Sequence, residues 1–335
     1  MELLVLGGTR FLGRAVAEEA SRRNHAVTCL ARGSAPPPDG VTFVRADRDE
    51  DGGLAPVAGR PWDGVVDLTV HPVHVRRAVR DLSADHLLLV STANVYRDDV
   101  GPEPDEDAPL VPALDADRMA GTETYGGAKV ACEQAVLTSG TPAAVVRPGL
   151  IGGSGDASGR SGYWPWRFAH PVGAEVAVPD DPELPVALVD VRDLAAFVVT
   201  ASEQQLRGPF NVTGPTTTLA QALTTAAEVA ATRARVHAIP PPVLARLGVR
   251  PWMGPTSMPL WLDDPDLRGF GTLDTGRARA AGLRTRPLAD TLRAALSYEE
   301  TRTVPRAAGL TDEEERRVLA AARHTLGGWS DRPPP

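Results

Sequence analysis

LLVLGGTRFLG, residues 3–13, joins a short apolar run to a glycine-rich turn and the start of a helical pattern. The run predicts a buried strand, and apolar residues at helical spacing from Phe11 to Ala20 predict a helix directly after the turn. A strand, a Gly-rich turn and a helix in this order are typical of a parallel sheet that binds a dinucleotide. Amide groups at the start of such a helix can hold a pyrophosphate.

The alternation of apolar runs with helix-period segments continues over the first 150 residues. Predicted strands lie near Glu2–Leu6, Ala26–Leu30, Val41–Arg45, Gly64–Leu68, His86–Ser91 and Ala143–Arg147. This pattern predicts an α/β fold with a Rossmann-like, doubly wound parallel sheet.

After Pro148 the chain becomes rich in Gly, Pro, Trp and Arg, which predicts a smaller α/β C-terminal substrate domain. Val186–Asp190 and the helix after it are expected to return to the first domain, whereas Phe210–Val212 is expected in the second. The predicted division is 1–148 plus about 183–205 for dinucleotide binding, about 149–182 plus 206–305 for substrate, and 306–335 as a C-terminal helix and tail.

The composition narrows the function classes. With 42% apolar and 23% charged residues the chain is an ordinary globular protein, and its net charge of -8 disfavours nucleic acid as a partner. We find neither an apolar run of about 18 residues, as a membrane span needs, nor a basic leader. Cys29 and Cys132 lie in apolar segments, where reduced thiols are expected. We therefore expect a cytoplasmic protein.

The residues around the glycine turn bear on the cofactor. Arg32 ends the second predicted strand, where an acidic residue would bind a ribose hydroxyl, so NADP(H) is favoured over NAD(H). The alternative for Arg32 is an ordinary surface charge. Asp47 is either an adenine ligand or a loop cap, and Arg10 replaces a loop glycine with a guanidinium that could reach a phosphate. The predicted cofactor-binding residues are Gly7, Thr9, Arg10, Phe11, Leu12, Gly13, Arg32, Asp47, Leu68, Ser91, Lys129 and Pro148.

Tyr125 and Lys129 form the strongest candidate for chemistry. Lys129 is the only lysine in the chain, and a spacing of four places it on the same helix face as the phenol. An ammonium beside a phenol favours the phenolate, so the pair could exchange a proton near neutral pH. A hydroxyl at the end of the fifth strand, Ser91 or Thr92, would complete the group.

These motifs resemble the extended short-chain dehydrogenase/reductases, often labelled the NAD-dependent epimerase/dehydratase family. The resemblance extends from Gly7–Gly13 through Tyr125–Lys129 to Leu188–Leu194. It implies that Thr92 binds the substrate oxygen, that Tyr125 transfers the proton and that Lys129 holds the nicotinamide ribose, with Ser91 as the alternative to Thr92. It also implies a homodimer through helices of the first domain, although acidic residues near the Tyr125 helix leave a monomer open.

Three functions remain open at this stage. We favour an NADP(H)-dependent oxidoreductase that reduces a carbonyl, C=N or C=C bond of a small, flat or cyclic metabolite, with Tyr125 as proton donor. The first alternative is a redox-neutral nucleotide-sugar epimerase or dehydratase, and the second is a non-catalytic NADP sensor or scaffold. The predicted substrate residues are Thr92, Asn94, Gly149, Tyr163, Trp164, Arg167 and Arg192. No metal site is predicted, because the close pair His71 and His74 lacks a third ligand.

Overall fold

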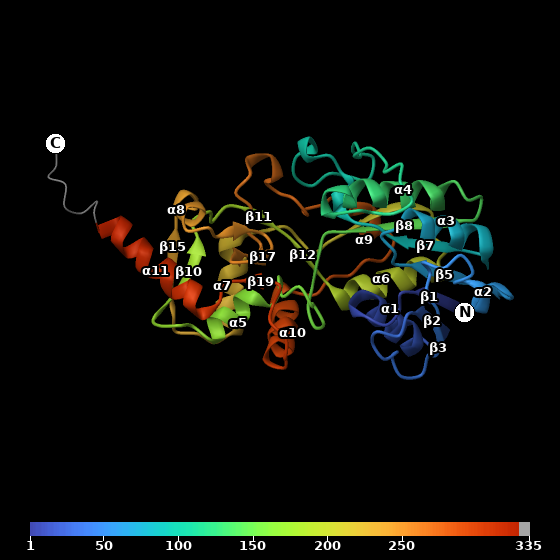
Figure 1. Cartoon of the computed structure of the whole chain (residues 1–335), viewed down its shortest axis with the longest axis horizontal. Coiled ribbons are helices and arrows are strands. Elements are labelled where there is room, and N and C mark those ends of the chain that lie inside the picture. The colour runs from blue at the N-terminus through green and yellow to red at the C-terminus, as the bar shows by residue number, and fades with distance from the viewer. Residues whose placement is uncertain (328–335) are drawn as a thin grey trace. The chain divides into compact units, whose positions relative to one another are not determined.

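The computed structural model describes residues 1–327 and divides the chain into two compact units (Figure 1). Unit 1 consists of Met1–Ile151, Ala187–Pro215 and Phe270–Arg286, and unit 2 consists of Gly152–Val186, Thr216–Gly269 and the chain from Pro287 onward. The predicted division was wrong in two respects: residues 206–215 and 270–286 belong to unit 1, and the C-terminal helix belongs to unit 2. The predicted tail, residues 328–335, lies outside the described residues.

Unit 1 is built on a seven-stranded sheet in the order β13-β8-β7-β5-β1-β2-β3. Every neighbouring pair in it is parallel. The strands are β1 (Glu2–Leu6), β2 (Ala26–Ala31), β3 (Thr42–Arg45), β5 (Gly64–Asp67), β7 (Leu87–Val90), β8 (Ala143–Pro148) and β13 (Gly208–Val212). The predicted α/β fold and its six strands are confirmed.

The seventh strand corrects one prediction. Phe210–Val212, assigned from sequence to the second domain, lies in β13 and pairs with β8. Val186–Asp190, expected as a strand that returns to the first domain, contains the last residue of β11 (Pro185–Val186) and all of β12 (Leu188–Asp190). β12 and the helix after it do return to unit 1, but β12 lies outside the seven-stranded sheet. A short apolar run does not reveal which distant strand it will pair with. The sequence pattern therefore could not show that Phe210–Val212 joins the central sheet and that Val186–Asp190 does not.

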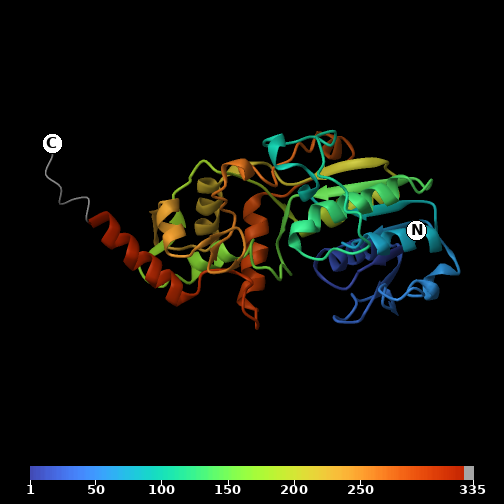
Figure 2. The same ribbon diagram turned by 45° about the horizontal axis from the view of Figure 1, so that its top comes forward.

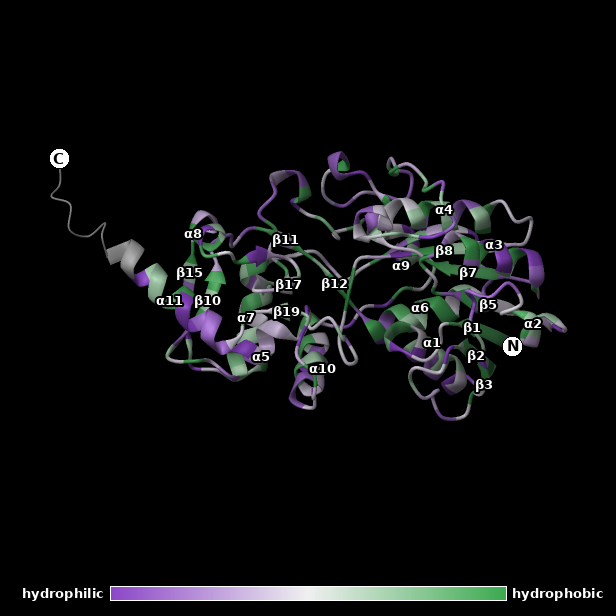
Figure 3. Ribbon diagram, viewed as in Figure 1, coloured by the Kyte–Doolittle hydropathy of each residue, from purple (hydrophilic) through white to green (hydrophobic). Residues whose placement is uncertain are grey.

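Helices cover both faces of the sheet. α1 (Phe11–Arg22) and α6 (Val191–Glu203) lie side by side on one face, and α3 (Pro72–Asp81) and α4 (Tyr125–Leu137) lie on the other (Figures 1 and 2). Because side chains alternate along a strand, Leu3 and Val5 enter the core under α1 while Leu4 enters the opposite core. Most residues of these strands are correspondingly apolar (Figure 3).

Short elements connect these layers. They are α2 (Ala55–Ala58), β4 (Pro61–Trp62), β6 (Ser83–Ala84), the 3-10 turns η1 (Ala93–Val95), η2 (Asp98–Val100) and η3 (Thr122–Thr124), and α9 (Gly276–Ala280). β9 (Leu150–Gly152) lies at the end of the first segment of unit 1.

Unit 2 packs helices around small two-stranded sheets. Its helices are α5 (Tyr163–Ala169), α7 (Leu219–Val229), α8 (Pro241–Arg246), the 3-10 turn η4 (Pro265–Leu267), α10 (Leu288–Glu300) and α11 (Asp312–Gly327). Its strands, besides β11, are β10 (Glu175–Pro179), β14 (Thr217–Thr218), β15 (Arg235–Ile239), β16 (Arg250–Pro251), β17 (Gly254–Pro255), β18 (Ser257–Met258) and β19 (Ala308–Gly309). Within residues 1–327, no helix has the length and apolarity needed to cross a membrane.

The two cysteines provide a test of this packing. Cys29 and Cys132 are free thiols with fully buried side chains, and burial raises the pKa of Cys29 to about 11 and that of Cys132 to about 12. Because the thiolate is the reactive form, we expect neither thiol to react with a disulfide reagent at pH 8 in the native protein, and both to react after unfolding in guanidinium. Rapid native-state labelling of either one would contradict the described cores.

Candidate functional site

The glycine-rich turn after β1 brings backbone groups very close together. Gly7 has a φ of +102°, and a Cβ placed on Gly13 would lie 2.2 Å from the Gly7 carbonyl oxygen. Only glycine at position 13 allows the first turn of α1 to pack directly on this loop. The turn thus presents backbone at the start of α1, as the binding of a pyrophosphate requires.

A cavity of about 330 Å³ opens beside this turn, at the carboxyl ends of β1, β2, β3 and β5. The strand order reverses between β1 and β5, and that reversal is the place where doubly wound sheets bind nucleotides. The cavity wall includes six predicted cofactor residues, namely Gly7, Thr9, Arg10, Arg32, Asp47 and Leu68. The turn, the cavity and its basic residues together fit an adenine dinucleotide.

The other residues of the first α1 turn have different surroundings. Phe11 is partly buried and has a φ of 34°, in the left-handed region that side chains rarely adopt. The Leu12 side chain packs in the core, so this residue can offer a cofactor only its backbone. The prediction that Phe11 and Leu12 bind the cofactor therefore stays a prediction.

Arg48 lines the cavity and forms an ion pair with buried Asp67 at the end of β5. Both Nη atoms of Arg48 donate to the Asp67 carboxylate at 2.7 Å, and one also donates to the His74 carbonyl at 2.8 Å. Burial is the largest influence on Asp67 and works to raise its pKa, but Arg48, the Thr69 amide and the charge of Lys129 together hold that pKa below its usual value. Sequence reasoning missed this pair, although Arg48 directly follows the singled-out Asp47.

Lys129 is buried, with only 2% of its surface exposed, and its direction is set by two backbone carbonyls. Its Nζ donates to the oxygens of Thr69 and Val90, each at 2.6 Å. An ammonium has three N–H donors, so two are used and one remains for a further acceptor. Tyr125, the first residue of α4, precedes Lys129 by one helical turn.

Thr92 lies under the start of α4. Its hydroxyl is buried and donates to Asn94 Oδ1 at 2.9 Å, while the Asn94 amide donates back to Thr92 Oγ1 at 3.3 Å. A Cβ on Gly126 would lie 2.2 Å from the Asn94 carbonyl oxygen. Glycine after Tyr125 therefore lets α4 rest on η1, which brings Tyr125, Lys129 and Thr92 to the same edge of the sheet.

Ser91 does not share this position. Its hydroxyl donates to Glu133, and its amide donates to the Val146 carbonyl at 2.6 Å. Glu133 also receives two hydrogen bonds from Arg147, at 3.0 and 2.7 Å, in a fully buried ion pair. The Ser91 side chain is thus part of the interior, and predicting it as a cofactor residue or as the alternative to Thr92 is corrected.

Pro148 is the last residue of β8, and Gly149 follows it at the same carboxyl edge. Val212 at the end of β13 pairs with Pro148, and a Cβ on Gly149 would lie 2.6 Å from the Gly271 carbonyl oxygen. Gly149 is therefore enclosed by backbone of unit 1.

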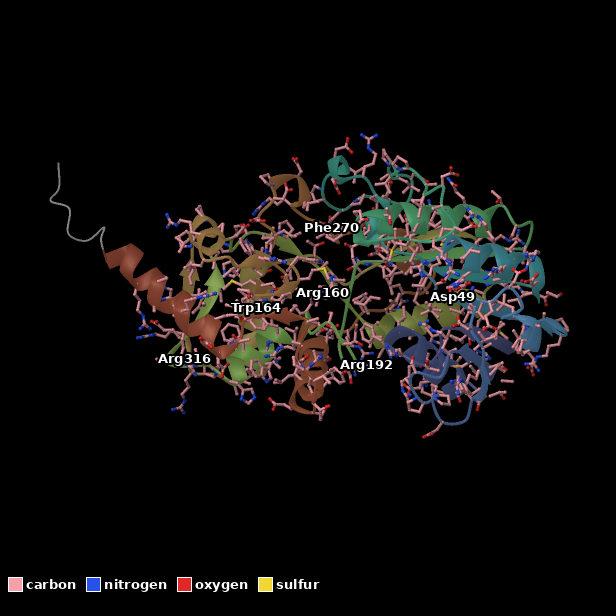
Figure 4. All side chains as sticks on the ribbon, in the orientation of Figure 1. Asp49, Arg160, Trp164, Arg192, Phe270 and Arg316 are labelled. Atoms are coloured by element: carbon pink, nitrogen blue, oxygen red, sulfur yellow. The ribbon has the colours of Figure 1, made fainter. Side chains whose placement is uncertain are left out.

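Three predicted substrate residues belong to the core of unit 2. Trp164 (Figure 4) donates from Nε1 to the Pro259 carbonyl at 2.7 Å. Tyr163 and Arg167 have no exposed surface. Arg167 donates to Asp312 Oδ1 and to the Leu310 carbonyl, each at 2.8 Å. Their burial inside unit 2 corrects the prediction that they face a substrate.

Arg192, at the start of α6, makes a bidentate ion pair with Asp190 at 2.8 Å, and Asp190 also caps the helix by accepting from the Arg192 amide (Figure 4). In the part of the chain that the structure describes, no group of three or more His, Cys, Asp or Glu side chains is arranged to hold a metal ion.

Comparison with known proteins identifies the family. Residues 3–213 match the model of the NAD dependent epimerase/dehydratase family. The chain belongs to this family. It is an NAD(P)-dependent enzyme of the extended short-chain dehydrogenase/reductase type, and the predicted resemblance is confirmed. A search of curated proteins found no match.

Solved structures of epimerases share the fold. A putative epimerase from Burkholderia cenocepacia has a TM-score of 0.67 at 22% identity, with 90% of this chain and 98% of that one covered. UDP-glucose 4-epimerase from Thermus thermophilus, in complex with NAD, has a TM-score of 0.63 at 20% identity, with 90% and 99% covered. UDP-N-acetylglucosamine 4-epimerase from Bacillus cereus has a TM-score of 0.65 at 16% identity, with 89% and 99% covered.

Replacing Gly126 with Ala tests the contact between α4 and η1. Alanine is the better helix former, but its Cβ would meet backbone that cannot move aside cheaply. We expect a loss of stability of about 1–3 kcal/mol in urea unfolding. We also expect a fall in turnover of about 10²-fold, because Tyr125 is displaced. The control is Gly52→Ala, where nothing lies within 4 Å of the added Cβ. Equal effects of the two substitutions would refute the role of this contact.

Proposed function

We propose that this protein is a redox-neutral epimerase or dehydratase of a nucleotide sugar. The sequence alone favoured a net reductase, but the family match and the similarity to UDP-sugar epimerases support the alternative better. The observation that carries the proposal is that buried Lys129 on α4 donates to the Val90 carbonyl at the end of β7, the strand that Thr92 follows, while Tyr125 begins the same helix.

In this proposal the bound nicotinamide supplies a reversible acceptor for one hydride. The Thr92 hydroxyl binds the oxygen of the reacting secondary alcohol, and the Tyr125 phenolate takes the proton from that oxygen as the C–H bond breaks. For an epimerase, the hydride would return to the opposite face of the resulting ketone carbon while Tyr125 gives the proton back to the oxygen, so the carbon is inverted and no cofactor is consumed. For a dehydratase, water would in addition leave from carbons next to the ketone before the hydride returns. Atoms and electrons therefore balance within one turnover.

Lys129 supports both parts of this chemistry. It follows Tyr125 by one turn of α4 and places a positive charge on the same face of that helix. Its third N–H is directed by the bonds to Thr69 and Val90 and would hold a ribose hydroxyl of the cofactor. The low exposure of Lys129 keeps water from weakening these interactions.

Interconversion of epimers tests the proposal. With catalytic NAD(P)⁺, we expect UDP-glucose or a related nucleotide sugar to form its epimer or dehydration product, followed by NMR, without net change in nicotinamide absorbance. Tyr125→Phe should lower this rate by about 10²- to 10⁴-fold, since it removes the proton acceptor. The matched control is Tyr298→Phe, which removes a phenol from α10 in unit 2.

A different outcome would select another function. Stoichiometric oxidation of NADPH on a panel of carbonyl compounds, with no interconversion, would replace this proposal with the net reductase. Cofactor binding without turnover in either assay would favour the non-catalytic NADP sensor or scaffold.

Arg32 supports the reductase as the second candidate and NADP(H) as the cofactor. It lies on the cavity wall at the end of β2, where a carboxylate would repel a 2'-phosphate and a guanidinium can bind it. A reductase consumes its cofactor and must exchange it, which suits the NADP(H) pool.

Replacing Arg32 with Ala tests this assignment. One charge-assisted hydrogen bond contributes about 1.5–3 kcal/mol, so we expect NADP⁺ affinity to fall by about 10- to 100-fold in calorimetry, with little change for NAD⁺. The control is Arg45→Ala at the end of β3, outside the cavity wall. Equal losses for the two cofactors would show that Arg32 does not bind a phosphate.

A further inference from the structure

The turn that follows β5 connects the cofactor cavity to Lys129. Asp67 Oδ1 accepts from the Thr69 amide at 3.0 Å, and Thr69 Oγ1 accepts from the His71 amide at 3.2 Å. The carbonyl of the same threonine accepts from Lys129 Nζ at 2.6 Å. The backbone conformation at Thr69 therefore sets where one of the two acceptors of the ammonium lies.

His74 on α3 holds this threonine by its side chain. Its Nδ1 lies 2.9 Å from Thr69 Oγ1, and its Nε2 lies 2.7 Å from Asp49 Oδ1. Arg118 and His74 lower the pKa of Asp49 to about 2, so Asp49 is a carboxylate and can only accept. Nε2–H therefore donates to Asp49, and Nδ1 accepts the Thr69 hydroxyl proton.

Neutral His74 is the form that suits this arrangement. Burial, followed by the charge of Arg48, lowers the pKa of His74, although Asp49 and Asp67 act in the opposite direction. His71 packs edge-on against its ring at 5.3 Å between centroids. The imidazole thus bridges the loop after β3 and the turn after β5 with one donor and one acceptor.

Asp49 and His74 are themselves held by further hydrogen bonds. Arg118 donates to Asp49 at 2.6 Å, and Arg48 holds both Asp67 and the His74 carbonyl. Asp49 itself lies on the cavity wall, as do Thr69 and His74 (Figure 4). A continuous chain of hydrogen bonds therefore runs from Asp49 on the cavity wall through His74 to Thr69, whose carbonyl accepts from Lys129.

We propose that His74 is a positioning residue for Lys129. By holding the Thr69 hydroxyl, it fixes the Thr69 carbonyl, and that carbonyl directs the flexible lysine side chain. The catalytic consequence rests on the proposed function, whereas the placement of the ammonium does not. Sequence reasoning noted His71 and His74 only as a pair too small to bind a metal.

The single lysine makes a direct experiment available. Protein grown with lysine labelled with carbon-13 at Cε gives one side-chain NMR signal, that of Lys129. We expect His74→Phe and Thr69→Val to shift this signal toward its position in the unfolded protein. We expect His74→Asn and Thr69→Ser to keep it near the wild-type position. The Asn amide oxygen matches Nδ1 as an acceptor, and Ser keeps the hydroxyl.

Turnover is the second readout. Misplacement of a catalytic group can cost about 10²-fold in rate, so we expect His74→Phe and Thr69→Val to lower kcat by about 10- to 100-fold, with restoration by the Asn and Ser variants. A variant that only loosened the fold would lower the melting temperature without this pattern of rescue.

A second pair of substitutions, at exposed residues, tests the role of His74 with less risk of unfolding the protein. Asp49→Ala removes the acceptor of His74 at a side chain that is 42% exposed. The matched control, Asp51→Ala, removes a carboxylate that is 81% exposed in the same loop and pairs with Arg77 at 3.0 Å. We expect only Asp49→Ala to move the Lys129 signal.

Two results would separate failure of the inference from failure of the proposed function. An unmoved Lys129 signal in folded His74→Phe, Thr69→Val and Asp49→Ala would overturn the positioning role. A displaced signal with unchanged turnover would instead remove the catalytic role assigned to Lys129.

Discussion

The burial of one ammonium group constrains the rest of unit 1. Lys129 reaches one backbone carbonyl at the end of β7 and another in the turn after the neighbouring strand β5, and it can do so only if α4 lies over the ends of these two strands. The glycine after Tyr125 allows that approach, because any side chain there would meet the Asn94 carbonyl. An arginine would not replace this lysine, since a planar guanidinium cannot occupy the compact site of an ammonium. This requirement gives a reason for lysine at this position in a chain whose other basic residues are arginine.

Two buried carboxylates near this ammonium form ion pairs with arginines. Asp67 is paired with Arg48 and also lies in the field of Lys129. Glu133, on α4, is paired with Arg147 from β8 and accepts from Ser91. Buried ion pairs add little net stability compared with apolar packing, but breaking one is costly, so they favour one arrangement of the strand ends. We infer that the Asp67–Arg48 and Glu133–Arg147 ion pairs hold the strand ends in place at the proposed site.

Unit 1 carries all the groups that we propose for proton and hydride transfer. The aromatic cluster of unit 2 has another purpose, because Tyr163 and Trp164 form a core closed by buried Arg167. An aromatic-rich segment therefore did not indicate the shape of the substrate. The substrate class proposed here rests on family membership and on similar folds, and the assay of epimer formation tests it directly.

The sequence by itself determined the features that depend on local spacing. The glycine turn after β1, the parallel strands and the Tyr125–Lys129 spacing could all be read from it, because each depends on residues within one element or one turn. Only the tertiary structure decided which distant groups meet. Lys129 and Thr69 are 60 residues apart, Ser91 and Glu133 are 42 apart, and Arg167 and Asp312 are 145 apart. The pairing of β13 with β8 is equally non-local. Such contacts depend on how whole elements pack, and periodicity along the chain carries no information about that choice.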